Sequence, residues 1–184
     1  MKLKVFKILK YELTPSHLDT YDYLCDLTSQ RLNPSSLEKK QMKLIENVIL
    51  CSNLNRAVDC IERDDNTPLN LLNEIPFELS VLCTRDEWIN RGSSVVRERF
   101  KEAFINDALL IKRSLIFEQI EDLIKICKTI DSEIAIVSHS FRIKLIEAYI
   151  KTQGEIKNNP ELINQFIFDE IKTLDFGSSI ILEI

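Results

Sequence analysis

Residues 133–138 read Glu133-Ile-Ala-Ile-Val-Ser138, and the chain continues His139-Ser140-Phe141-Arg142. Four consecutive apolar residues between polar neighbours are typical of a strand buried on both faces of a parallel sheet. A second run, Asn47-Val-Ile-Leu-Cys51, has the same character. Both strands are followed by helical patterns. Strands that alternate with helices predict an α/β fold of three layers, α/β/α, around a mainly parallel central sheet.

Working outward, we assign the rest of the chain by its apolar periodicity and its breakers. The amphipathic pattern over 114–130 places six apolar residues on one helical face. The other predicted helices cover 18–32, 36–44, 54–63, 93–107 and 141–151, and the other predicted strands cover 3–9, 74–83 and 179–183, with a loop at 64–68.

Composition excludes several function classes. The chain has 184 residues, which favours a single domain over 1–184, and a net charge of −5, which argues against a nucleic-acid partner. It has three glycines, too few for a glycine-rich phosphate loop. Its five cysteines contain no CxxC pair, so we expect no metal, no cofactor and a reduced, cytoplasmic protein. No stretch has the length of a membrane span, so we expect no membrane partner.

Polar and cationic side chains follow the predicted strands. In open α/β sheets, ligands bind outside the carboxyl ends of the strands. Lys10 follows the first strand, Arg56 the second, and His139 and Arg142 the strongest one. We expect these four to converge on one crevice, with Ser140 beside them. Cationic side chains at helix N-termini suit an anion, above all a phosphate.

Three stretches resemble the histidine phosphatase superfamily, the phosphoglycerate-mutase-like proteins. Cys51-Ser-Asn-Leu-Asn-Arg-Ala57 is similar to the Ser-x-Leu-x-Arg-Ala segment of that family, and Ile134-Ala-Ile-Val-Ser-His-Ser140 to its second-histidine strand. Phe176-Gly-Ser-Ser-Ile-Ile-Leu-Glu183 is similar to its closing strand, and Arg91-Gly-Ser-Ser94 is a weaker match. The resemblance implies a phosphoglycerate-mutase-like fold and a phosphate site that contains Arg56 and His139.

The first strand departs from that family. Its members carry Arg-His-Gly there, and the histidine is the nucleophile. The matching residues here are Lys10-Tyr-Glu12. Tyr11 therefore replaces the nucleophile, and a phenol with a pKa of about 10 is a poor nucleophile at neutral pH unless it is activated. The acid of the family falls on Glu78 or on Glu87, neither of which lies in a clear motif.

These residues lead to three functional hypotheses. The first is a degenerate, histidine-phosphatase-like pseudoenzyme that binds a phosphorylated or anionic small molecule or phosphopeptide through Lys10, Arg56, His139 and Ser140. The second is an active phosphatase or altered enzyme that uses His139 and Arg56 with a replaced nucleophile, in which His139, Tyr11 and Glu78 are catalytic. The third is a scaffold or homodimer that uses the helices at 93–107 and 114–130.

Overall fold

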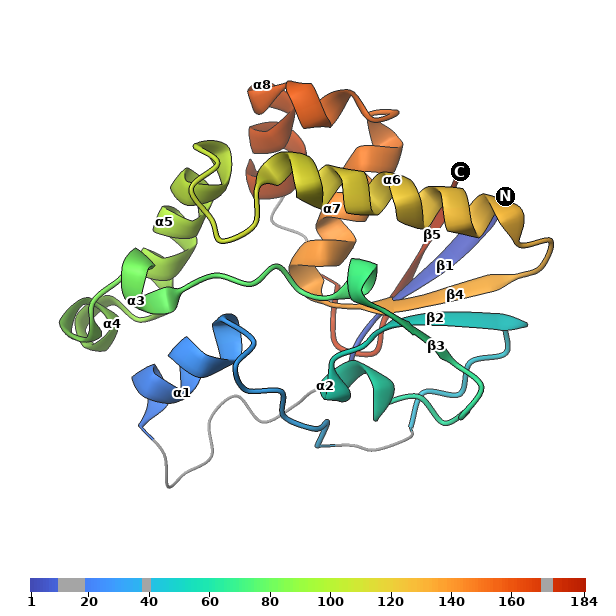
Figure 1. Ribbon diagram of the computed structural model, residues 1–184, viewed down its shortest axis with the longest axis horizontal. Coiled ribbons are helices and arrows are strands. Elements are labelled where there is room, and N and C mark those ends of the chain that lie inside the picture. The colour runs from blue at the N-terminus through green and yellow to red at the C-terminus, as the bar shows by residue number, and fades with distance from the viewer. Residues whose placement is uncertain (10–18, 38–40, 170–173) are drawn as a thin grey trace.

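A mixed sheet forms the centre of the protein (Figure 1). The computed structural model describes residues 1–9, 19–37, 41–169 and 174–184. Within these segments the strand order is β3-β2-β4-β1-β5. The first four strands in that order run parallel, and β5 pairs antiparallel with β1. The strands are β1 (Lys2–Lys7), β2 (Val48–Ser52), β3 (Thr67–Leu69), β4 (Ile134–Ser138) and β5 (Ser179–Glu183).

Helices flank the sheet and extend beyond one end of it. The described helices are α1 (Thr20–Thr28), α2 (Asn55–Val58), α3 (Leu79–Leu82), α4 (Arg85–Arg91), α5 (Ser93–Ile105), α6 (Arg113–Thr129), α7 (Ser140–Lys151) and α8 (Pro160–Ile163), with the 3-10 turns η1 (Asn70–Leu72) and η2 (Glu155–Asn158) and the π-helix η3 (Asn164–Asp169). None of the described helices is long and apolar enough to cross a bilayer.

The two faces of the sheet carry separate cores. Alternate strand residues such as Val5 and Ile136 point to the side of α6 and α7, where they pack with Ile120 and Leu145. The intervening residues, such as Ala135 and Val137, pack on the other side with Ala57 of α2 and with the segment around Met42. All five residues of β4 are buried, as its apolar run predicts. The predicted α/β class, with a mainly parallel central sheet flanked by helices, is confirmed.

A third, smaller core lies beyond the carboxyl ends of the strands. There α1, α3, α4 and α5 gather (Figure 1) around Leu79, Cys83 and Val95. A capping box starts α4: the Thr84 side chain accepts a hydrogen bond from Glu87, and Glu87 accepts one from Thr84. This helical layer therefore faces the end of the sheet at which the sequence places the site.

Most of the elements predicted from the sequence are confirmed within a few residues. These are β1, β2, β4 and β5 among the strands, and α1, α5, α6 and α7 among the helices. The predicted strand over 74–83 is wrong. Its apolar residues serve two different cores, Ile75 that of the sheet and Leu79 that of the helical layer, so the segment turns into the short helix α3 instead of extending.

The segment between α1 and β3 also differs from the prediction. The described part of the helix expected over 36–44 is not helical, because Met42 forms a parallel bridge with Ile61. The same bridge explains why the helix expected over 54–63 ends at Val58. The expected loop over 64–68 contains the start of β3, and Pro68 is tolerated there because β3 is an edge strand.

Candidate anion-binding site

The register of the parallel strands brings three polar strand ends together. Ser52 ends β2 and Ser138 ends β4, and the register pairs Cys51 with Val137. On the other side of β4, Lys7 at the end of β1 pairs with Ser138. The residues that follow β2 and β4 therefore leave the sheet side by side, as the sequence predicts.

His139 begins a buried chain of hydrogen bonds. It is 3% exposed, and its Nε2 atom lies 2.9 Å from the Ser52 hydroxyl oxygen. The Ser52 hydroxyl donates to Asn73 Oδ1 at 2.7 Å, and the backbone N–H of Asn53 donates to the same oxygen at 3.1 Å. Because a backbone N–H can only donate, it fixes which end of the Asn73 amide is the oxygen.

This chain determines which ring nitrogen of His139 carries the proton. The single hydroxyl hydrogen of Ser52 is used on Asn73, so Ser52 accepts from His139, and the ring is protonated on Nε2. Burial lowers the pKa of His139 well below its usual value, and the positive charges of Arg56 and Arg142 lower it further. His139 is therefore a neutral imidazole at pH 7.

Two buried guanidinium groups share the site. Arg56 of α2 is 3% exposed and Arg142 of α7 is 1% exposed. Arg142 donates from Nε to the Asn73 carbonyl oxygen at 2.8 Å and from Nη2 to Gln119 at 3.0 Å. Its Nη1 atom is buried and makes no hydrogen bond to the described part of the chain. Burial lowers the pKa of Arg142 to about 10, so the group stays charged at neutral pH.

Glu74 is the acidic side chain of this cluster. One of its carboxylate oxygens accepts from the backbone N–H of Arg142 at 3.2 Å, and the other accepts from that of Phe141 at 3.3 Å. The carboxylate therefore occupies the N-terminus of α7. Burial raises the pKa of Glu74, while hydrogen bonds from the backbone N–H groups of Phe141 and Ile75 and the charges of the two arginines oppose the rise. The helix end that we expected to receive a ligand anion thus already holds an internal carboxylate.

Lys7 adds a further cation on the β1 side. It is 8% exposed and donates to the Leu174 carbonyl oxygen at 2.8 Å. Burial lowers its pKa, and the negative charges of Asp175 and Glu74 oppose that shift. The sequence prediction overlooked Lys7 because it counted this residue as part of a strand instead of as the strand's polar end.

No protein-family model and no curated protein sequence matches the chain. Several solved structures do match the chain. A mycobacterial hydrolase overlays with a TM-score of 0.52 at 12% identity, over 98% of this chain and 90% of that one. The two proteins share a fold.

Two phosphatase structures overlay at a TM-score of 0.49. The α-ribazole phosphatase of Shigella flexneri is 17% identical, with 100% of this chain and 91% of that chain covered. A phosphoserine phosphatase variant of Entamoeba histolytica, solved with phosphoserine, is 16% identical, with 98% and 89% covered.

The structure brings together part of the predicted site. Arg56, His139 and Arg142 converge as expected, and Ser140 follows directly as the first residue of α7. Lys10 and Tyr11 lie outside the described residues, so their placement stays a prediction.

The two carboxylates predicted as acids have other partners. Glu78 precedes α3 and accepts a hydrogen bond from Arg31 at 2.8 Å. Glu87 is held by Arg99 and by the Thr84 cap, and these contacts lower its pKa to about 2. Glu74 is instead the carboxylate in electrostatic contact with Arg56 and Arg142.

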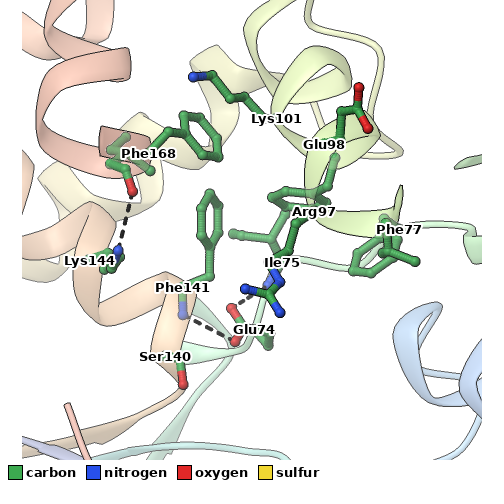
Figure 2. A pocket seen from close by; sticks show the side chains of 13 residues that line it. Glu74, Ile75, Phe77, Arg97, Glu98, Lys101, Ser140, Phe141, Lys144 and Phe168 are labelled. Carbon is green, nitrogen blue, oxygen red and sulfur yellow. Dashed lines mark hydrogen bonds between the residues drawn. The ribbon is translucent and has the colours of Figure 1, made fainter. Parts of the chain in front are cut away.

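A cavity of about 610 Å³ adjoins this cluster (Figure 2). Glu74, Ser140 and Phe141 line it, so it begins one residue beyond His139. Its remaining walls come from α5, the segment that follows Glu74, Lys144 of α7, and η3. The cavity gives the strand-end cluster a neighbouring space large enough for a small-molecule ligand.

Proposed function

We propose that this chain is a divergent member of the histidine phosphatase superfamily that binds a phosphorylated or other anionic ligand without phosphohistidine catalysis. The two most specific sequence matches to that superfamily contain Arg56 and His139. Arg56 lies in α2, the helix that follows β2, and His139 directly follows β4; the charge of Arg56 lowers the pKa of His139. The proposed pseudoenzyme character rests on the sequence, in which Tyr11 stands at the position of the nucleophile.

The observation that carries this proposal is the accumulation of buried positive charge. Arg142 is buried, its hydrogen-bonding partners are the neutral groups of Asn73 and Gln119, and one of its nitrogen atoms makes no hydrogen bond to the described residues. Burying an ion costs several kcal/mol unless opposite charge compensates it. Glu74 opposes the charge of Arg142, and Asp175 and Glu74 oppose that of Lys7. The charge of the buried Arg56 also acts on both His139 and Glu74. A phosphate bound beside Arg142 would offset part of the cost of burying that guanidinium group.

The test is calorimetric titration with orthophosphate. We expect saturable binding by the wild type and a loss of affinity of about tenfold or more in Arg56→Lys, which keeps the charge but loses the fork that matches a phosphate. Arg91→Lys is the matched control, because Arg91 pairs with Glu98 on the surface. Absence of phosphate binding by the wild type, or equal binding by Arg56→Lys, would overturn the proposal.

One observation favours the alternative of an active phosphatase. A general acid needs a pKa near the working pH, and burial raises the pKa of Glu74 in that direction. In this alternative, Glu74 takes the role that we expected for Glu78, and His139 and Arg56 hold the transferred group. Hydrolysis of an aryl phosphate that is lost in Glu74→Gln but kept in Glu78→Gln would support it.

A further inference from the structure

The cavity beside the strand-end cluster has an aromatic wall. Phe77, Phe100, Phe141 and Phe168 line it. Phe100 meets Phe77 and Phe141 edge to face, with ring centroids 5.0 Å and 4.9 Å apart, and Phe141 lies 6.0 Å from Phe168. The four rings therefore form a continuous series that comes from four separate parts of the fold. Each ring is held by its neighbours, so the wall is preformed.

The π-helix η3 supplies the far side of this cavity. Ile167 and Phe168 belong to η3, and both line the space. Figure 2 shows Lys144 of α7 reaching the backbone of η3, where its Nζ atom donates to the Ile167 carbonyl oxygen at 3.4 Å. A π-helix is uncommon and occurs frequently at functional sites. Here it places Phe168 beside Phe141 in the cavity wall (Figure 2).

The remaining lining residues carry charges of both signs. Arg97, Lys101 and Lys144 are cationic, and the two acidic lining residues are Glu74 and Glu98. Glu98 pairs with Arg91 at 2.8 Å, and Lys101 pairs with Asp169 at 3.6 Å. Lys101 also lies 5.6 Å from the centre of the Phe168 ring. The aromatic wall is therefore the feature of this lining that selects an occupant.

Two residues connect the cavity with the anion site. Ser140 follows His139 directly and lines the cavity, and Glu74 does so while it binds the N-terminus of α7. A phosphate at the His139 end would therefore place the group esterified to it at the mouth of the aromatic space. Aromatic walls favour a flat ring, which they contact by stacking or edge to face.

We propose that this cavity holds the aromatic ring system of a phosphate monoester whose phosphate group lies beside Arg56 and His139. The inference rests on the proposed function and adds the class of ligand to it. The volume of about 610 Å³ is more than a methyl or glyceryl ester needs, and it lies within the range of pockets that bind drug-sized ligands.

Calorimetry with three probes tests this inference. Orthophosphate reports the anion site alone, methyl phosphate adds a minimal ester, and 1-naphthyl phosphate adds a ring system. We expect 1-naphthyl phosphate to bind about tenfold or more tightly than methyl phosphate. Phe168→Ala and the milder Phe168→Leu should reduce that ratio without changing the affinity for orthophosphate. Phe6→Leu is the control, because Phe6 packs on the other face of the sheet.

The outcomes separate this inference from the function on which it rests. Equal affinities for the two esters, with orthophosphate still bound, would overturn the aromatic class alone. An advantage of the naphthyl ester that Phe168→Ala and Phe168→Leu leave unchanged would overturn the assignment to this cavity. Binding of 1-naphthyl phosphate that Arg56→Lys does not weaken would overturn the shared site. Failure of all three probes to bind would overturn both proposals.

Discussion

The Nε2 atom of His139 lies 2.9 Å from the hydroxyl oxygen of Ser52, although 87 positions separate the two residues in the chain. The contact exists because β2 and β4 are neighbours in the sheet and end at the same level. It joins the two segments that most resemble the histidine phosphatases, and it determines the protonation of the ring. The proposed anion site is thus an outcome of strand order.

We predict that His139 is protonated on Nε2 alone at pH 7. The chain has two histidines, so nitrogen–proton correlation spectra of the ring are simple to assign with a His17→Gln variant. Ser52→Ala should disturb the spectrum of His139, because the variant removes the hydroxyl that accepts its proton. A ring protonated on Nδ1 would contradict the hydrogen-bond chain from His139 to Asn73.

His139 should make the protein less stable as the pH falls below about 6.5. The unfolded ring takes up a proton near that pH, whereas the folded ring does not, because burial and the two arginines lower its pKa. Unfolding then binds a proton, so stability is lost by up to about 1.4 kcal/mol per pH unit until the folded pKa is reached. Urea unfolding between pH 7 and pH 5 should show a steeper loss in the wild type than in His139→Gln. Parallel curves would contradict this account.

Glu74 should matter more for stability than Glu78. Glu74→Ala leaves two N–H groups at the start of α7 without their acceptor, at a cost of about 1–3 kcal/mol. Glu78→Ala breaks a more exposed ion pair with Arg31, for which about 1 kcal/mol or less is expected. Chemical unfolding of the two variants measures both values. A larger cost for Glu78→Ala would contradict the role that we assign to Glu74.

Tyr11→His should give the protein phosphatase activity, because it places a histidine where the family that the sequence resembles carries its nucleophile. We expect the wild type to leave p-nitrophenyl phosphate intact between pH 4 and pH 9, since a phenol with a pKa of about 10 is a weak nucleophile. The Tyr11→His variant should gain measurable hydrolysis, and adding Arg56→Ala should abolish that gain. Wild-type hydrolysis that Arg56→Ala removes would instead favour the active enzyme.

The strongest strands and the cationic residues that follow them could be predicted from the sequence. The apolar run over 134–137 is long enough to indicate a strand buried on both faces, which placed His139 and Arg142 at its carboxyl end. The apolar run over 48–51 predicted the position of Arg56 in the same way. These predictions succeed because local pattern and burial agree.

Glu74 could not be found by this reasoning. The sequence assigned a strand that began at Glu74, which would have put the residue at the opposite end of the sheet from the site. Its role depends on the N-terminus of α7, 67 positions later in the chain, and on the burial that raises its pKa. No local sequence pattern predicts a contact between residues so far apart in the chain. The sequence offered one indication, which is that Glu74 follows shortly after the edge strand β3. That strand was not predicted, because Pro68 lies within it.

The histidine ring spectrum recorded during a titration with orthophosphate shows whether the anion binds beside His139. We expect a saturable shift of the His139 resonances with the same midpoint as the calorimetric titration, absent in Arg56→Lys at the same phosphate concentration. Resonances of His139 that do not move while the protein binds phosphate would place the anion elsewhere and overturn the proposed site.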